Sequence, residues 1–277
     1  MEAIPDIPRP PGIVVGYDGS SGGEQAVYWA SREARDRGCH LTVCVATGDL
    51  GPAASNTLNE PDSDELLDAG MRLARRLLGS EELHPLLLPG RPVPVLCGLG
   101  QGADIVVVGS HGRGGMPGMA IGSVGLYVAA HAPGPVVIVR GHWEPGQHAS
   151  MPVVVGSDGS AGSAAAVRFC FEEASLRDTW LLAVCALADQ AGALGNYRQI
   201  EASFNELIEE CRKKYPEVAV TRKVSAGPAR SALLQASSAA QIVAVGARGR
   251  GGLDEMALGS VSIAVASYAS CPAAIVR

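Results

Sequence analysis

Short apolar runs alternate with longer amphipathic segments along the chain, and the whole alternation occurs twice. In the first half, runs rich in Val, Ile and Leu predict five strands, at 13–17, 41–47, 83–88, 105–109 and 135–140. Segments with apolar residues at helical spacing predict helices at 23–37, 64–79 and 124–132, with a weaker helix at 92–101. Strands that are apolar on both faces and alternate with helices are typical of a parallel sheet covered by helices on both sides.

The second half repeats the same order of elements. Strands are expected at 153–157, 181–187, 218–224, 242–246 and 273–277, and helices at 163–176, 200–214, 229–239 and 261–269. The segment 11–23 matches 152–163, which pairs Asp18 with Asp158. The repeat predicts two domains, 1–140 and 151–277, joined by a linker at 141–150 that is rich in Gly, Pro and polar residues.

A glycine pattern, G-x2-G-x9-G-S, follows an apolar run and precedes a helical segment in each half. The first copy comprises Gly109, Gly112, Gly122 and Ser123, and the second comprises Gly246, Gly249, Gly259 and Ser260. Glycines at such a junction let backbone N–H groups approach an anion, and the helix N-terminus adds its dipole. Ligands of open α/β sheets lie beyond the carboxyl ends of the strands, so the pattern predicts one phosphate site per half.

The side chains beside the glycines leave some roles open. The chain has no Gly-Lys-Ser or Gly-Lys-Thr, so phosphate is expected on backbone amides and the hydroxyl of Ser123 or Ser260. Arg113 and Arg250 either pair with that phosphate or are solvated loop charges. His111 occupies the loop position that Arg248 has in the second copy, and the same two roles are open to both.

Asp18 and Asp158 each follow the first strand of their half and precede Gly-Ser. An Asp at this position can cap the following helix. It can also accept hydrogen bonds from the ribose or base of a nucleotide whose phosphates lie on the glycine loop. The spacing favours neither role over the other.

Composition narrows the class of protein. Hydrophobic residues make up 47% of the chain, which is enough for a core in each half. The net charge of −6, without a basic cluster, argues against nucleic-acid binding. The seven cysteines lie mostly in apolar runs and form no C-x-x-C, as expected of reduced thiols in a cytoplasmic protein. The polar, proline-rich N-terminus does not have the pattern of a signal peptide, and no apolar stretch is long enough for a membrane span.

Two other motifs carry little weight. Gly19-Ser20-Ser21-Gly22-Gly23 fits the nucleophile elbow G-x-S-x-G, but the second copy has Ala161 in place of the central serine. The segment 98–103 fits a dinucleotide-binding fingerprint, but it precedes a strand instead of opening a helix. The six histidines have no metal-ligand spacing, and no protein metal site is expected.

The Asp after the first strand and the complete glycine pattern, present in both halves, resemble the nucleotide-binding subclass of tandem universal stress proteins. The resemblance covers about 12–140 and 151–277. It implies, in each half, a doubly wound five-stranded parallel sheet of order 3-2-1-4-5. This is the Rossmann-like α/β fold of the adenine nucleotide alpha hydrolase type. It also implies ATP or ADP, with Mg²⁺, in each half.

The resemblance also implies a set of nucleotide contacts. In the first half these are Gly16, Tyr17 and Asp18 near the adenosine, Val45 beside the adenine, and Val108, Gly109, His111, Gly112, Gly122, Ser123 and Val124 around the ribose and phosphates. In the second half they are Gly156, Ser157 and Asp158, then Ala186 beside the adenine, and Val245, Gly246, Arg248, Gly249, Gly259, Ser260, Val261 and Ser262. Gly125 stands where the second half has Ser262, which predicts one phosphate hydroxyl fewer in the first site. Ala186 in place of Val45 predicts looser adenine packing in the second.

The family resemblance suggests association through the last strand of each half. The runs 135–140 and 272–277 are short and apolar and are expected at sheet edges, which pair readily when uncovered. We expect an internal pseudo-dimer of the two halves and a homodimer of chains. The favoured function is a nucleotide-binding regulator of the stress response with an unidentified protein partner. The alternatives are a slow ATP hydrolase or phosphoryl or adenylyl transferase, and a scaffold without ligand.

Overall fold

The computed structural model describes residues 12–48, 62–113, 120–141, 149–186, 194–225, 227–249 and 257–277. The chain divides into two compact units, Met1–Gly141 and His142–Arg277, and each is described by itself. Most of the expected linker, residues 142–148, lies outside the described residues.

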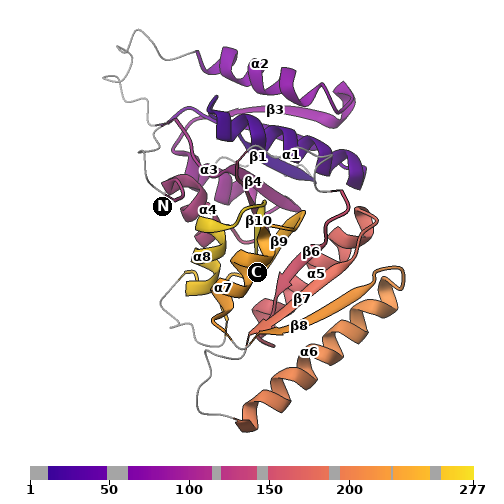
Figure 1. Cartoon of the computed structure of the whole chain (residues 1–277). Helices are drawn as coiled ribbons and strands as arrows, with labels where there is room; N and C mark the ends of the chain where they lie inside the picture. The colour runs from indigo at the N-terminus through magenta and orange to yellow at the C-terminus, as the bar shows by residue number, and fades with distance from the viewer. Residues whose placement is uncertain are drawn as a thin grey trace. The chain divides into compact units, whose positions relative to one another are not determined.

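The first unit is built on a five-stranded parallel sheet (Figure 1). Its strands are β1 (Ile13–Gly16), β2 (Leu41–Ala46), β3 (Leu83–Leu88), β4 (Ile105–Gly109) and β5 (Val136–Val139). They lie in the order β3-β2-β1-β4-β5, which confirms the order 3-2-1-4-5. The strand order reverses between β1 and β4, so the carboxyl ends of these two strands form the switch point where such folds bind ligands.

Helices cover both faces of this sheet. Its elements are α1 (Ser21–Arg37) and α2 (Ser63–Ala74) on one face, α3 (Pro92–Leu99) and α4 (Ser123–His131) on the other, and the short 3-10 turn η1 (Ser80–Glu82). α1 begins after Ser20, whose side chain accepts a hydrogen bond from the amide of Gly23, and it ends at Gly38 with φ +63°. α2 is shorter than the expected helix at 64–79, because a turn begins at Arg75.

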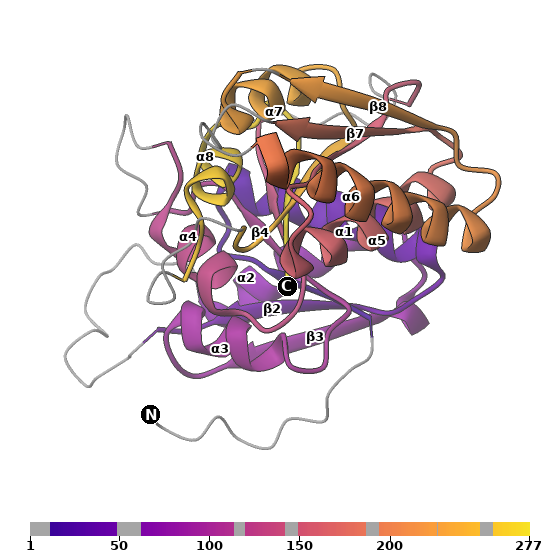
Figure 2. The same ribbon diagram turned by 90° about the horizontal axis from the view of Figure 1, so that it is seen from below.

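The second unit has the same architecture (Figure 2). Its strands are β6 (Val153–Gly156), β7 (Leu181–Ala186), β8 (Val220–Ser225), β9 (Ile242–Gly246) and β10 (Ala273–Val276), in the order β8-β7-β6-β9-β10. Its helices are α5 (Ala161–Leu176), α6 (Leu194–Lys214), α7 (Ala229–Ser237) and α8 (Ser260–Tyr268). α6 begins six residues before the helix expected at 200–214, and its first turn includes Gly195 and Asn196, which are poor helix formers.

The central strands form the core of each unit. Val14 and Val15 of β1, and their counterparts Val154 and Val155 of β6, are fully buried. No helix in the described part of the chain is both long and apolar enough to cross a membrane.

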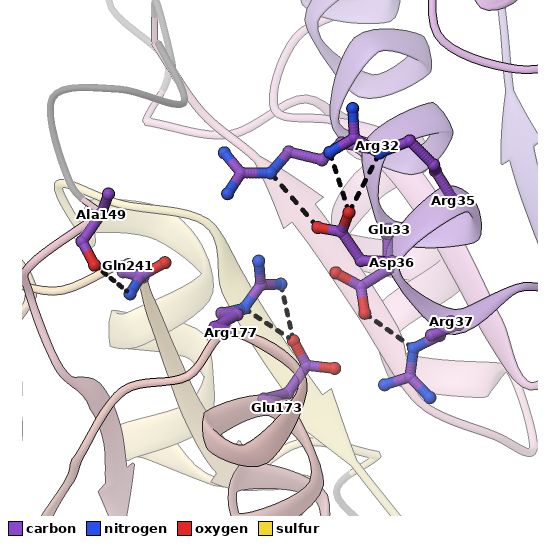
Figure 3. A network of polar contacts seen from close by, with 9 residues as sticks. All are labelled: Arg32, Glu33, Arg35, Asp36, Arg37, Ala149, Glu173, Arg177 and Gln241. Atoms are coloured by element: carbon purple, nitrogen blue, oxygen red, sulfur yellow. Dashed lines mark hydrogen bonds and ion pairs between the residues drawn. The ribbon is translucent and has the colours of Figure 1, made fainter.

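Each unit also contains a buried ion pair at the same place in its first helix (Figure 3). Near the end of α1, Arg37 Nε donates to Glu33 Oε1 at 2.6 Å, and near the end of α5, Arg177 Nη2 donates to Glu173 Oε2 at 2.6 Å. Arg177 and Glu173 lie almost wholly out of solvent, so their mutual attraction offsets part of the cost of burying the two charges.

Candidate functional site

In the first unit, Asp18 ties the turn after β1 to the glycine loop after β4. Its Oδ1 accepts hydrogen bonds from the amide and the hydroxyl of Ser20, at 3.0 and 2.6 Å. Its Oδ2 accepts one from the backbone amide of Arg113, at 3.0 Å. The side chain of Asp18 therefore connects, through hydrogen bonds, two loops that are far apart in sequence.

Ser20 adds to the same connection. Its hydroxyl lies 3.2 Å from the carbonyl oxygen of His111, and it accepts the amide of Gly23 as the cap of α1. Beside it, Ser110 Oγ lies 3.1 Å from His111 Nδ1. The cap of α1 is therefore Ser20, and Asp18 holds Ser20 in place instead of capping the helix itself.

Close packing of this turn explains the first two glycines of the pattern. A Cβ on Gly109 would lie 2.5 Å from the carbonyl carbon of Gly22, and a Cβ on Gly112 would lie 2.5 Å from Asp18 Oδ2. The second unit has the same contacts: a Cβ on Gly246 would lie 2.6 Å from the carbonyl carbon of Gly162, and one on Gly249 would overlap Asp158 Oδ2. Glycine is needed at these positions whether or not a ligand is bound.

The third glycine is less tightly packed, although a Cβ on Gly122 would lie 3.3 Å from the carbonyl oxygen of Ser110. Gly122 (φ −71°, ψ 155°) and Gly259 (φ −73°, ψ 159°) have extended backbones that any residue adopts. The nearest atom to a Cβ on Gly259 would be Ser262 Oγ at 3.6 Å, which is an ordinary contact. Each of these glycines is the N-cap of the helix that follows, α4 or α8.

The N-termini of α4 and α8 differ from those of α1 and α5. Ser20 and Ser160 cap α1 and α5 with side-chain hydrogen bonds, whereas no side chain in the described residues caps α4 or α8. The hydroxyl-bearing Ser123 and Ser260 begin these helices and are exposed. Uncapped first-turn amides, the helix dipole and a hydroxyl together form a place that favours an anion.

The second unit repeats the turn at Asp158, and Gly249 of its glycine loop lies against Asp158 Oδ2, with one difference in the turn. The amide of Ser160 donates to Asp158 Oδ1 at 3.0 Å, and Ser160 caps α5 through the amide of Ser163 at 3.2 Å. Ser157 stands in place of Tyr17, and its hydroxyl donates to Ser163 Oγ at 3.1 Å. In the first unit the Tyr17 ring occupies this region instead, so the two turns differ in the volume they fill.

The strand register corrects the expected match between Val45 and Ala186. Gly16 is paired with Cys44, and Gly156 with Val184. The residue that follows in each strand is Val45 in β2 and Cys185 in β7, so the counterpart of Val45 is Cys185, and Ala186 lies one position further. Burial, and then the negative charges of Asp158 and Glu201, raise the pKa of the Cys185 thiol. The expected loosening by an alanine is therefore wrong, because a buried thiol occupies that position.

Ser262 is also placed differently from the expectation. It is buried, and its hydroxyl donates to the carbonyl of Gly246 at 2.7 Å, so that proton is not directed at a ligand. Its counterpart Gly125 leaves a Cβ only 3.3 Å from the carbonyl oxygen of Gly109. The difference between the two halves therefore concerns how the helix packs on the end of β4 or β9.

The remaining expected residues fall into two groups. Val108 and Val245 are buried in β4 and β9, and Gly16 and Gly156 are covered by Leu96 and Leu233, whose methyl groups would lie 2.9 and 2.7 Å from an added Cβ. Val124 and Val261 lie in the first turns of α4 and α8, while Arg113 and Arg248 are exposed on the loops. Arg250 lies outside the described residues.

An open cavity of about 650 Å³ adjoins Asp18 in the first unit. Three expected residues line it, Tyr17, Asp18 and Arg113. The remaining lining consists of Gly19 and five residues of α2 that the sequence did not single out: Glu65, Leu66, Asp68, Ala69 and Arg72. The one sequence signal was a predicted helix with charged residues on one side, which reads equally as a solvated face.

Tyr17 forms part of the inner surface of this cavity. It is 5% exposed and lies against Gly70 of α2, where a Cβ would be 2.8 Å from Tyr17 Cδ1. Burial, followed by the charges of Glu24 and Asp18, raises the pKa of the Tyr17 phenol, while Arg72 and Arg113 act in the opposite direction. Across the described part of both units, no group of three His, Cys, Asp or Glu side chains is arranged to hold a metal ion.

The comparisons with known proteins agree over the whole chain. The model of the universal stress protein family matches residues 12–140 and 150–277. The universal stress protein Rv2623 of Mycobacterium tuberculosis H37Rv is 33% identical over 288 residues, covering 96% of this chain and 96% of that protein. Rv2005c of the same strain is also 33% identical, covering 96% and 97%. The crystal structure of a universal stress protein from Archaeoglobus fulgidus DSM 4304 has a similar fold, with a TM-score of 0.69, 17% identity and coverage of 96% and 98%.

Proposed function

Because the chain belongs to the universal stress protein family, we propose that it is a regulatory protein of the stress response that binds ATP or ADP in each half. One observation carries this proposal: α4 and α8 each begin at a glycine with an extended backbone, and neither helix has a side-chain cap among the described residues. A phosphate at these N-termini accepts hydrogen bonds from the first-turn amides, which have no partner within the helix, and its negative charge complements the helix dipole.

The residues present fit a nucleotide phosphate. The amides of the first turn and the hydroxyls of Ser123 and Ser260 are the proposed donors. Bound nucleotide supplies the negative charge that these donors lack, and Mg²⁺ accompanies the phosphates, since protein sites for this ion usually rely on substrate phosphates and water. Asp18 accepts a hydrogen bond from its glycine loop, and Asp158 packs against Gly249 of the other; the remaining acceptor capacity of both carboxylates is directed at the nucleoside.

Regulation fits this site better than catalysis. Asp18 already accepts three hydrogen bonds from protein donors, so it is poorly suited to take a proton from water. We propose that bound nucleotide changes the conformation of the glycine loops and, through them, the affinity for a partner protein. The seven free cysteines support a cytoplasmic location. We also propose that the apolar last strands of the two halves pair, and that chains form dimers.

Nucleotide released from freshly purified, denatured protein, identified by mass spectrometry, tests the proposal. We expect adenine nucleotide, and calorimetric titration of emptied protein with ATP is expected to give about two sites per chain. A Gly122→Val, Gly259→Val double variant places side chains over both helix N-termini and is expected to bind none. Gly79→Val is the matched control, because Gly79 has nearly the same backbone angles (φ −67°, ψ 158°) but lies before η1. Undiminished binding by the double variant would reject these loops as the site.

A further inference from the structure

We propose that α2 completes the ligand site of the first half, and that Glu65, Asp68 and Arg72 contact the nucleoside end of the nucleotide. We further infer that the second half lacks this contact, so the two sites differ in their selectivity. This inference rests on the proposed function and specifies which part of the ligand the first half recognises.

The cavity beside Asp18 has the size and position that this role requires. Its volume of about 650 Å³ falls within the usual range for small-molecule sites. Tyr17 and Leu66 give it an apolar surface, and the charged side chains of Glu65, Asp68 and Arg72 surround that surface on the α2 side. A cavity with an apolar wall and a few charged groups suits a base and a ribose.

The cavity lies close to the proposed phosphate site. Gly112 lies against Asp18, because a Cβ there would be 2.5 Å from Asp18 Oδ2. Gly122 in turn lies against Gly112, since a Cβ on Gly122 would be 3.7 Å from the amide nitrogen of Gly112. One glycine of the loop therefore separates the cavity from the start of α4. A nucleotide with its phosphates at α4 has its nucleoside at the cavity.

The charged residues of α2 are available for a ligand. In the described part of the first unit, the side chains of Glu65, Asp68 and Arg72 form no hydrogen bond or ion pair with protein. All three side chains are exposed, so they contribute little to the stability of the fold. Packing therefore does not explain why these residues are charged. They differ in this respect from the corresponding residues of α6.

The register of the neighbouring strands identifies those counterparts. β2 and β3 begin their pairing at Leu41 and Leu83, and β7 and β8 begin theirs at Leu181 and Val220. Counting back equally from Leu83 and Val220 matches the buried Met71 with the buried Ile208. The same count matches Glu65, Asp68 and Arg72 with Ala202, Asn205 and Glu209.

In the second half these positions serve a different purpose. Arg222 of β8 donates to Asn205 Oδ1 at 2.9 Å and to Glu209 Oε1 at 2.9 Å. The side chains therefore hold α6 to its edge strand. Leu207 also stands where the first half has Gly70, the residue that admits the Tyr17 ring. The α2 surface that lines the cavity in the first half thus has a counterpart of different charge and shape in the second half.

The charged side chains of α2 that line the cavity suit the nucleoside part of a nucleotide. Ribose hydroxyls and an exocyclic amino group are donors, and the carboxylates of Glu65 and Asp68 are acceptors. Carboxylates facing ribose hydroxyls recur in dinucleotide-binding folds. The guanidinium of Arg72 can lie on the face of the base or donate to its ring nitrogens, and Arg113 lies on the side nearer the phosphates.

A transplant of the second half's residues into the first tests the inference. The triple variant Glu65→Ala, Asp68→Asn, Arg72→Glu leaves the net charge unchanged, because two lost acidic charges balance the reversal at arginine. Its control is Asp64→Asn with Arg75→Gln, which alters exposed residues of α2 and its C-cap outside the cavity lining and also conserves net charge. Both variants and the parent protein are titrated with ATP and, separately, with inorganic tripolyphosphate.

We expect ATP to bind one of the two sites of the triple variant about tenfold more weakly or worse, as for the loss of a hydrogen bond to a charged group. Tripolyphosphate affinity is expected to stay the same, because it lacks a nucleoside, and the control is expected to match the parent. Unchanged ATP binding at both sites of the triple variant, or equal weakening of ATP and tripolyphosphate, overturns the inference while leaving the proposed function intact. A parent protein that binds no ATP overturns both.

Discussion

Replacing Asp18 by alanine is expected to destabilise the first unit as well as its ligand site. The substitution removes the acceptor for three hydrogen bonds: two from Ser20, at 3.0 and 2.6 Å, and one from the amide of Arg113, at 3.0 Å. Hydrogen bonds to a charged group are worth about 1.5 to 3 kcal/mol each when buried. Because Asp18 is only half-buried and water can reach its partners, we expect a total loss of about 2 to 4 kcal/mol.

Denaturant unfolding of the Asp18→Ala protein, without nucleotide, measures this loss. Hydrogen exchange supplies a local readout, since the amide of Arg113 is expected to exchange faster once its acceptor is gone. Asp68→Ala is the control, because this exposed carboxylate has no hydrogen-bond partner among the described residues, and its effect is expected to stay within about 0.5 kcal/mol. An Asp18→Ala protein as stable as the parent, with an equally protected Arg113 amide, would refute the structural role and favour a purely ligand-directed one.

Further predictions concern packing, buried charge and pH. Gly112→Ala places a methyl group against Asp18 Oδ2 and is expected to cost about 1 to 3 kcal/mol in denaturant unfolding even without ligand, whereas a destabilisation seen only with nucleotide present would contradict the packing argument. Glu173→Ala removes the carboxylate that Arg177 contacts at 2.6 Å, and breaking this buried ion pair is expected to lower the free energy of unfolding by about 3 to 5 kcal/mol; a loss below about 1 kcal/mol would show that the pair contributes little to stability. Burial raises the pKa of Cys44 and of Cys271 from 9.0 to about 12, so their contribution to stability is complete below pH 9 and is lost as the pH rises toward 12. At pH 10 each thiol is expected to cost about 1.4 kcal/mol relative to pH 8, and a protein with alanine at both positions is expected to show a shallower decline.

The sheet could be predicted because its strands carry their own signal. Val14 and Val15, like Val154 and Val155, belong to apolar runs that only a strand buried on both faces explains, and the strand order followed from the family resemblance. Helix ends were less certain. Arg75 and Arg76 fit a helical pattern, but α2 ends at Ala74 and the chain forms a turn at 75–77.

The site was predicted in part. The repeated Asp and glycines identified the loops, because close backbone approach requires glycine and leaves a visible trace in sequence. The match of Val45 with Ala186 failed by one residue, since a strand of continuous apolar residues contains no mark of register, and only the pairing of Gly156 with Val184 fixes it. The role of Ser262 could not be read either, because a hydroxyl in a first helical turn can face a ligand or the preceding strand.

The three glycines of the pattern are under different packing constraints. The loops that they form are shared by the two halves, and the differences between the halves lie outside them. The first two glycines keep the loop against the turn that carries Asp18 or Asp158, so any chain with this loop architecture needs them, with or without ligand. The third is less constrained: a Cβ on Gly259 would make an ordinary contact at 3.6 Å, and one on Gly122 would lie 3.3 Å from the carbonyl oxygen of Ser110. Selectivity therefore has to come from side chains outside the pattern. The wall beside the loop is where the halves differ most: exposed charges at Glu65, Asp68 and Arg72 in one half, and the contacts of Arg222 with Asn205 and Glu209 in the other. A duplicated domain can diverge there at little cost in stability, because exposed helix positions tolerate substitution. Under our proposal, the shared loops bind phosphate in both halves, and the side chains of α2 add contacts with the nucleoside in the first half alone.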